Sequence, residues 1–261
     1  CSSKKFKNYF LKKKISLIIH LAAEVGVRNS FYNPYIYYQN NLRSFFNVLE
    51  ICRKNNSNLI FASSSSVYGS SDKSFFKESD NTSSPLSFYA ATKKCNELMA
   101  YSYTKNYNFS SIGIRFFNVY GPWGRPDMSI YKFTDLMIKN KKIPLYGSGK
   151  QLRDFTYIDD VVNLTNILIK KLNIKKKGYY DIFNSGKGNS INILNLLNIL
   201  SNKLNIKPKI QKKEKQRGDV FFTNSSSIKI REKLNYVPKI KLKKGIDSFL
   251  KWYLEIGSKI K

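Results

Sequence analysis

The sequence predicts an α/β fold built on a largely parallel sheet, and two observations favour it. Apolar runs of strand length alternate with longer segments of helical periodicity through the first half of the chain. With 261 residues, 42% of them hydrophobic, the chain is long enough to bury the core of one large domain or of one domain with a small lobe. No internal repeat is visible, so a repeat architecture is not indicated.

The expected elements follow one another in a β-α order. In the first half, strands are predicted at 15–22, 58–62 and 111–117, and helices at 34–54 and 86–106. After Gly121 the pattern loosens, with helices at 127–140, 159–172, 191–204 and 245–254 and a strand at 179–183. We expect this second half to form a substrate lobe over the carboxyl ends of the strands, where open α/β sheets bind ligands.

The composition bounds the function. The formal charge of +29 would attract polyanions. However, the lysines are spread through Asn- and Ile-rich segments, and no Arg-rich or aromatic-interleaved motif occurs. We therefore interpret the charge as compositional bias and do not expect specific nucleic-acid binding. Three scattered cysteines and no metal-ligand spacing predict a metal-free cytoplasmic protein. The longest apolar run, 15–23, is far shorter than the roughly 20 residues of a membrane span.

Tyr89 and Lys93 are the first candidates for chemistry. They are four residues apart in a predicted helix and therefore share one face. An ammonium close to a phenol favours the phenolate, which lowers the pKa of the phenol from about 10 towards the range of a general base. The pair alone is a weak signal in a lysine-rich chain. A strand that ends in the hydroxyl-rich segment 63–66, about 20 residues earlier, strengthens it because ligands bind at such strand ends.

Five segments in order resemble the extended short-chain dehydrogenase/reductases that act on nucleotide sugars, the NAD-dependent epimerase/dehydratase family. These segments are His20-Leu21-Ala22-Ala23, Ser64 to Gly69, Tyr89-x-x-x-Lys93, Arg115 to Pro122 and Arg153 to Asp160. The resemblance covers 15 to about 251 and implies a Rossmann-like, doubly wound parallel sheet with a smaller C-terminal α/β lobe. It assigns the NAD-binding part and the catalytic residues to 1–120, and the UDP-sugar lobe mainly to 121–261, with some segments returning to the sheet.

The resemblance also implies a mechanism. Segments 63–69 and 121–128 look most like UDP-glucuronate 4-epimerases. Tyr89 would take the proton of the sugar 4-hydroxyl while carbon 4 is oxidised by NAD, and return of the hydride to the other face of the 4-keto sugar would invert the carbon. Lys93 would bind the nicotinamide ribose and tune Tyr89. Ser64 would hydrogen-bond the 4-oxygen, although Ser65 or Ser66 could exchange roles with it.

The neighbours of Ser64 narrow the reaction. Related dehydratases and decarboxylases typically carry an acidic residue after the catalytic Ser or Thr, whereas Ser65 and Ser66 stand here, so simple epimerisation is favoured over those alternatives. A uronic 4-keto intermediate is a β-keto acid and loses carbon dioxide if its carboxylate turns out of the carbonyl plane. Ser65, Ser66 and the Asn118 amide could hold that carboxylate.

Further contacts are carried over residue by residue from the resemblance. Leu21, Ala22, Ala23 and Asn40 match residues that lie beside the cofactor, although core packing alone would also explain Ala22 and Ala23. Arg153 and Arg217 match arginines that clamp the UDP diphosphate, a role that suits the guanidinium fork. Arg125 and Arg28 are candidate carboxylate or loop contacts, with surface placement equally expected. The family is commonly dimeric through a bundle that would include the Tyr89 helix, so a homodimer is expected.

One part of the family pattern is not found. The strand, Gly-rich turn and helix that receive the cofactor pyrophosphate have no counterpart, and the first recognisable strand matches the fourth of the usual order. The chain also begins at Cys1 rather than Met, so its true beginning is expected to lie upstream. Three interpretations stay open: an epimerase, a sugar-nucleotide-binding fragment that no longer turns over, and a polyanion-binding protein.

Overall fold

The computed structural model describes residues 1–70, 73–216 and 218–259, and the chain divides into two compact units. The first unit comprises Cys1–Phe116 and Thr165–Asn184, and the second comprises Phe117–Leu164 and Ser185–Lys261. Each unit combines helices with strands, and the sheet of the first unit is parallel wherever its pairing is given, which confirms the predicted α/β class with a parallel sheet. The functional roles assigned to the two halves of the sequence stay predictions.

The first unit is built on a four-stranded sheet in the order β1-β2-β3-β7. Its strands are β1 (Leu17–His20), β2 (Asn58–Ser64), β3 (Ser111–Phe116) and β7 (Tyr180–Ser185). β1 pairs with β2 and β2 with β3 in parallel, and Phe61 lies opposite Gly113. Both inner strands are mostly buried on both faces, as expected of a covered parallel sheet, although β2 ends in serines and β3 carries Arg115.

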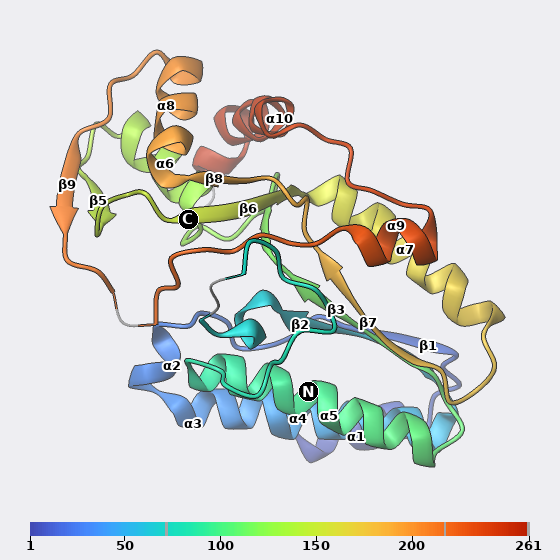
Figure 1. Cartoon of the computed structure of the whole chain (residues 1–261). Helices are drawn as coiled ribbons and strands as arrows, with labels where there is room; N and C mark the ends of the chain where they lie inside the picture. The colour runs from blue at the N-terminus through green and yellow to red at the C-terminus, as the bar shows by residue number, and fades with distance from the viewer. Residues whose placement is uncertain (71–72, 217, 260–261) are drawn as a thin grey trace. The chain divides into compact units, whose positions relative to one another are not determined.

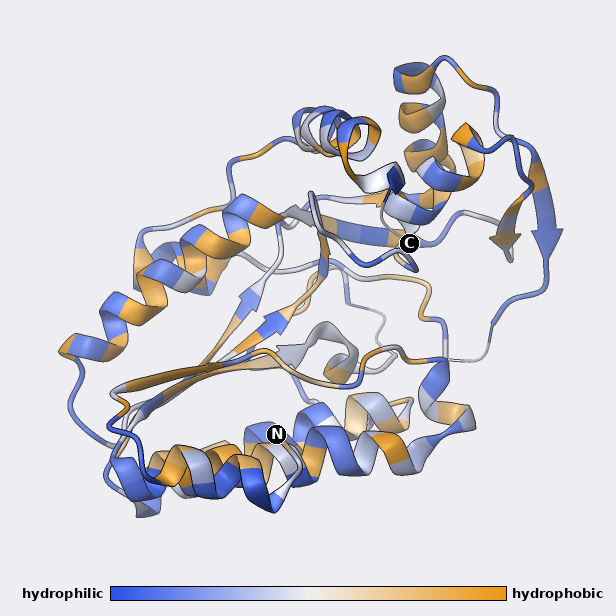
Figure 2. Ribbon diagram, turned by 180° about the vertical axis from the view of Figure 1, so that it is seen from behind, coloured by the Kyte–Doolittle hydropathy of each residue, from blue (hydrophilic) through white to orange (hydrophobic). Residues whose placement is uncertain are grey.

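Helices cover one face of this sheet, as Figure 1 shows for α4 and α5. The helices of the first unit are α1 (Lys4–Leu11), α2 (Asn29–Tyr32), α3 (Pro34–Tyr37), the π-helix η1 (Tyr38–Arg43), α4 (Ser44–Asn55), the 3₁₀ turn η2 (Ser65–Tyr68), α5 (Phe88–Asn106) and the part of α7 (Ile158–Ile174) from Thr165 onward. α5 begins at Phe88 because Ser87 caps it, its hydroxyl accepting a hydrogen bond from the backbone N–H of Ala90 at 3.1 Å. In Figure 2 hydrophobic and hydrophilic residues alternate along these helices, which is the pattern of one buried face.

The second unit holds two smaller sheets, β4-β6-β8 and β5-β9. Its strands are β4 (Asn118–Tyr120), β5 (Ile143–Tyr146), β6 (Leu152–Tyr157), β8 (Ser190–Asn192) and β9 (Ile210–Lys213). Its helices are α6 (Ser129–Ile138), the start of α7 (Ile158–Ile174), α8 (Ile193–Leu204), α9 (Ile228–Leu234), α10 (Leu242–Glu255) and the turn η3 (Gly257–Lys259).

Aromatic side chains dominate the core of the second unit. Tyr131 packs between Phe249, Trp252 and Tyr253, with ring centroids 5.2 to 6.2 Å away. Trp123, from the loop after Gly121, lies 5.6 Å from the ring of Trp252. These contacts hold the loop at 121–128 and helix α6 against α10.

Among the described residues of the whole chain, no helix has both the length and the apolar character needed to cross a bilayer.

Gly113 allows the closest approach within the first sheet. A Cβ added there would lie 2.5 Å from Cδ1 of Ile182 and 2.7 Å from Cζ of Phe61, both nearer than real Cβ contacts allow. We therefore expect Gly113→Ala to lower the free energy of unfolding by about 1–3 kcal/mol through overpacking, measured by urea denaturation with circular dichroism.

A second substitution tests that reason. Ile182→Val removes the Cδ1 atom that lies nearest the added Cβ, so the double variant Gly113→Ala/Ile182→Val should be more stable than Gly113→Ala alone. Equal stabilities of the two variants would show that overpacking against Ile182 is not the cause.

Candidate active site

Tyr89 and Lys93 lie one turn apart in the first half of α5, and Lys93 reaches into the sheet. The Lys93 side chain is 3% exposed, and its Nζ donates a hydrogen bond of 3.0 Å to the carbonyl oxygen of Ala62 in β2. The same Nζ lies 5.9 Å from the centre of the Tyr89 ring. Burial lowers the pKa of Lys93 to about 8, so the ammonium form persists at neutral pH.

Four consecutive serines, Ser63 to Ser66, lie at the end of β2 and the start of η2. Ser63 and Ser64 point to opposite faces, as successive strand residues do, and the Ser63 hydroxyl donates to Glu97 instead of facing the turn. The Ser64 hydroxyl accepts from the backbone N–H of Ser66 at 3.2 Å and donates to the Ser66 hydroxyl at 3.2 Å. The structure thus brings Ser64 and Ser66 together at the start of η2, where Ser65 and Ser66 are half-buried.

The predicted cofactor contacts follow the carboxyl end of β1. Leu21 is 57% exposed, Ala22 is exposed and Ala23 is half-buried. Core packing therefore does not explain Ala22. The half-buried Asn40 lies in the π-helix η1, where its carbonyl oxygen accepts a hydrogen bond from the Ser44 hydroxyl. Arg28 is exposed at the start of α2.

Asn41, next to the predicted Asn40, holds the loop after β1 in place. Its Oδ1 accepts from the Glu24 N–H at 2.7 Å, and its Nδ2 donates to the Glu24 carbonyl at 3.0 Å and to the Thr92 hydroxyl at 3.1 Å. The Thr92 hydroxyl in turn donates to the Tyr89 carbonyl at 2.7 Å. Asn41 thereby links the loop after β1 to the helical turn that carries Tyr89 and Lys93. A π-helix such as η1 often occurs at a functional site.

Tyr37 supports the same region from α3. Its ring meets the Tyr89 ring edge-on, with centroids 6.1 Å apart, and its hydroxyl lies 2.9 Å from the Val25 carbonyl and 2.7 Å from the Gly26 carbonyl. The ring is fully buried. The sequence analysis did not single out Tyr37 and Asn41. Their position on the inward face of a predicted helix could have indicated them, because a buried polar side chain needs a hydrogen-bond partner.

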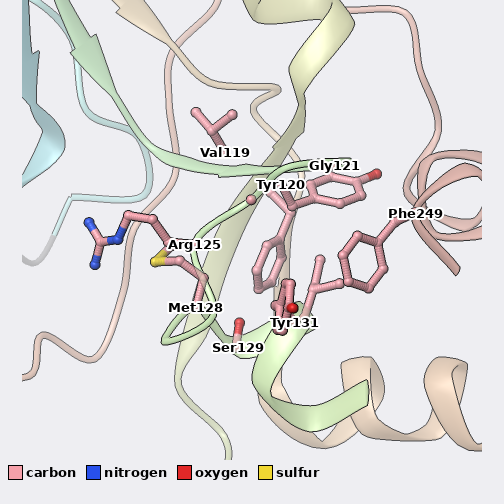
Figure 3. A pocket seen from close by; sticks show the side chains of 11 residues that line it. Val119, Tyr120, Gly121, Arg125, Met128, Ser129, Tyr131 and Phe249 are labelled. Carbon is pink, nitrogen blue, oxygen red and sulfur yellow. The ribbon is translucent and has the colours of Figure 1, made fainter. Parts of the chain in front are cut away.

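In the second unit, Asn118 precedes the loop at 121–128 and Arg125 lies within it. Asn118 is half-buried at the start of β4, opposite Phe155 of β6. Figure 3 shows a pocket of this unit in which Arg125 points away from the rings of Tyr120, Tyr131 and Phe249. The Arg125 Nε donates to Asp127 Oδ1 at 2.9 Å, and the Arg125 side chain is 43% exposed.

Arg153 lies on β6 with its guanidinium already engaged. Nη2 donates to Asp219 Oδ1 at 2.6 Å, and Nη1 donates to the Leu152 carbonyl at 2.8 Å. A diphosphate at Arg153 would therefore compete with Asp219 for the guanidinium. Arg217, the other predicted diphosphate contact, lies outside the described residues.

Two acidic residues of the Arg153–Asp160 segment have structural partners. The carboxylate of Asp154 accepts hydrogen bonds from the backbone N–H groups of Lys187, Gly188 and Ser225, at 2.9 to 3.0 Å. The carboxylate of Asp160 accepts in the same way from Lys239 and Ile240, both at 2.9 Å. Both side chains therefore hold loops of the second unit together.

Comparison with known proteins identifies the family of this chain. The profile of the NAD dependent epimerase/dehydratase family matches residues 1–186, which include Ser64, Tyr89 and Lys93. The chain belongs to this family. Members of the family are NAD-dependent enzymes, so the predicted enzyme class, the cofactor and the resemblance are confirmed.

Three relatives illustrate the similarity. Protein CapI of Staphylococcus aureus is 38% identical, over 98% of this chain and 82% of its own length. UDP-glucuronate 4-epimerase 4 of Arabidopsis thaliana is 41% identical, over 92% of this chain and 58% of its own length. The solved UDP-glucuronic acid 4-epimerase of Bacillus cereus, in complex with UDP-glucuronic acid and NAD, has a TM-score of 0.88 and 28% identity, over 97% of this chain and 79% of that one. This likeness confirms the predicted Rossmann-like fold.

The residues at the carboxyl end of β1 fit a bound dinucleotide. Leu21 and Ala22 offer an exposed apolar surface directly after β1, whose Ile19 is also exposed, and a flat ring could rest there. Lys93 on α5 and Ser64 at the end of β2 belong to neighbouring elements of the same unit. The roles of individual residues towards NAD and substrate stay predictions.

The only histidine of the chain provides a pH test of this end of the sheet. His20 is the last residue of β1, and burial, with a smaller effect of the Lys93 charge, lowers its pKa from 6.5 to about 4. As the pH falls, the unfolded chain therefore binds a proton at His20 before the folded chain does. The free energy of unfolding keeps its full value with respect to this group above pH 6.5, and it decreases by about 3 kcal/mol as the pH falls to 4.

We expect the single imidazole resonance in a proton NMR titration to report a pKa near 4. The unfolding free energy should depend less on pH between 6.5 and 4 in His20→Asn than in the parent. A measured pKa near 6.5 would contradict the burial of this ring.

Proposed function

We propose that the protein catalyses NAD-dependent 4-epimerisation of a UDP-sugar, namely of UDP-glucuronate to UDP-galacturonate, through a 4-keto intermediate. The observation that carries the proposal is the position of Lys93, whose buried ammonium contacts both the Tyr89 ring and the end of the strand that carries Ser64. Relatives named as UDP-glucuronate 4-epimerases, 36 to 41% identical to this chain, support the choice of substrate.

The residues of the first unit would divide the chemistry as follows. Tyr89 accepts the proton of the 4-hydroxyl and returns it after inversion, with the Lys93 ammonium favouring the phenolate. Ser64 donates a hydrogen bond to the 4-oxygen, and its contact with Ser66 keeps the hydroxyl oriented. NAD, when bound, supplies reversible oxidation of carbon 4. Leu21, Ala22, Ala23 and Asn40 are the proposed lining of its site, and Lys93 is the proposed contact to its ribose.

Further residues are proposed to bind the substrate. Arg153 and Arg217 would hold the diphosphate, with Asp219 released from Arg153 when the nucleotide binds. Ser65, Ser66 and Asn118 would hold the sugar carboxylate in the plane of the 4-keto group, and Arg125 would contact the carboxylate or the loop around it. Residues 1–120 thus provide the cofactor and catalytic part, and 121–261 provide most of the UDP-sugar lobe.

Two wider expectations belong to the same proposal. A homodimer through α4 and α5 is supported by exposed apolar side chains on both helices, Phe46 and Leu98 among them. A cytoplasmic location is supported by the free thiols of Cys1, Cys52 and Cys95, which form no disulfide.

Conversion of UDP-glucuronate tests the function directly. With NAD present, the purified chain should form UDP-galacturonate, detected by chromatography. Tyr89→Phe removes the proton acceptor and should lower kcat by about 10²–10⁴-fold. The matched control is Tyr101→Phe, an exposed tyrosine farther along the same helix, which should leave kcat unchanged.

Binding measurements separate the epimerase from a fragment that only binds sugar nucleotides. Calorimetric titrations with NAD and with UDP should both show binding if the enzyme proposal is right. Tight UDP binding together with no detectable NAD binding and no turnover would favour the fragment.

The carboxylate-holding role has its own test. Ser65→Ala should increase the share of decarboxylated keto product relative to UDP-galacturonate, because the carboxylate of the β-keto acid is held less firmly. Unchanged partitioning in Ser65→Ala and in Ser66→Ala would remove both hydroxyls from this role.

A further inference from the structure

α5 also carries a buried acidic residue on the face of Tyr89 and Lys93. Glu97 lies four residues after Lys93, so the three side chains occupy one face of the helix at successive turns. Glu97 is 3% exposed. Burying a carboxylate is costly unless it is paired and hydrogen-bonded, so its partners show what it holds.

Glu97 is paired with Arg115 of β3 through both oxygens. Arg115 Nε donates to Oε1 at 2.8 Å and Nη2 donates to Oε2 at 2.9 Å, a bidentate fork. Ser63, the residue before Ser64, donates to Oε1 at 2.6 Å. Burial raises the pKa of Glu97, but the hydrogen bonds and charge of Arg115 together with the Ser63 hydroxyl outweigh it, so its pKa lies below the ordinary value and the pair is ionised.

The remaining nitrogen of Arg115 holds the other end of the serine turn. Nη1 donates to the Tyr68 hydroxyl at 2.9 Å and to the Glu78 carbonyl at 3.3 Å. The Tyr68 hydroxyl donates onward to Asn184 Oδ1 at 2.6 Å, and the Tyr68 ring stacks on Phe76 at 4.7 Å. The segment Ser64–Tyr68 is thus held at its start by Glu97 through Ser63 and at its end by Arg115.

We propose that the Glu97–Arg115 ion pair positions the catalytic residues by fixing the turn 64–68 against helix α5, so that Ser64 stays in register with Tyr89. This inference rests on the proposed function. Lys93 sets the same register one helical turn earlier through the Ala62 carbonyl, so the strand end is bound to α5 at two consecutive residues, 62 and 63. The pair acts through Ser63 and Tyr68 and is a positioning pair rather than a catalytic one.

A role in positioning differs measurably from a role in stability alone. Glu97→Gln keeps the shape of the side chain but removes its charge and leaves Arg115 without its ionic partner. We expect kcat of the UDP-glucuronate reaction to fall at least tenfold, with KM and the calorimetric Kd for NAD within twofold of the parent. Ser63→Ala, which removes one hydrogen bond and keeps the ion pair, should show a smaller fall in kcat with KM unchanged.

The matched control is Glu50→Gln on α4. Glu50 makes the same kinds of contact in a more exposed setting of the same unit: a two-pronged pair with Arg53 at 2.9 Å and a hydrogen bond from the Tyr103 hydroxyl at 3.0 Å. It should leave kcat within twofold.

The double variant Glu97→Gln/Arg115→Met removes the unpaired charge and should recover much of the stability lost in Glu97→Gln. Its kcat should stay low if the pair positions the turn. Recovery of kcat together with stability, or an unchanged kcat in Glu97→Gln, would overturn the inference.

Hydrogen exchange provides a measurement that does not need turnover. In Glu97→Gln, amide protection should fall in residues 63–68 more than in the rest of the first unit, whereas Glu50→Gln should leave 63–68 unchanged. If the parent chain does not turn over UDP-glucuronate, the proposed function fails while this comparison still decides the positioning role. Uniform loss of protection, or no loss in 63–68, would refute it.

Discussion

The hydrogen bond from the Lys93 ammonium to the Ala62 carbonyl is the contact on which the rest of the candidate site depends. A buried ammonium must find an acceptor, and the carbonyl that it finds lies two residues before Ser64. Because a helix is rigid over one turn, this contact also fixes where Tyr89 lies relative to the strand end. Asn41 and Tyr37 then attach the loop after β1 to the same helix, so three elements converge on one end of the sheet.

Buried charged groups serve the same purpose in both units. In the first unit, the carboxylate of Glu97 joins a helix, a strand end and Arg115. In the second, Asp154 and Asp160 collect backbone N–H groups from segments 33 to 80 residues away in sequence. A hydrophobic contact could provide comparable stability, but it does not specify which atoms meet, whereas a satisfied buried carboxylate does. Several polar residues of the motifs therefore hold strand ends and loops in place.

Much of the first unit could be predicted from the sequence because its strands are continuous apolar runs and its helices have a clear period. The predicted segments 58–62 and 86–106 differ by only two residues at one end from β2 and α5. The six-residue strand β6 and the short strands β4, β5, β8 and β9 were not predicted. The short strands escape prediction because three or four residues acquire strand structure only from partners distant in sequence. The short helix α1 also had no counterpart among the predicted elements.

The site was predicted at the level of motifs, and its supporting contacts were not. Tyr89, Lys93 and Ser64 were singled out from spacing and from the family resemblance, whereas the partners of Glu97 and Arg115 depend on strand register, which spacing does not reveal. Asn40 and Asn41 are adjacent, and only the π-helical geometry of η1 shows that Asn41 turns towards α5. The pairing of Arg153 with Asp219 likewise joins residues 66 positions apart.

The contact between Trp123 and Trp252 has a practical consequence for spectroscopy. These are the two tryptophans of the chain, and both belong to the second unit. Intrinsic emission excited at the red edge of the absorption band therefore monitors that unit alone. A single fluorescence transition during denaturation would therefore not report the unfolding of the first unit, which carries Tyr89. A probe of the backbone, such as circular dichroism, is needed for that unit.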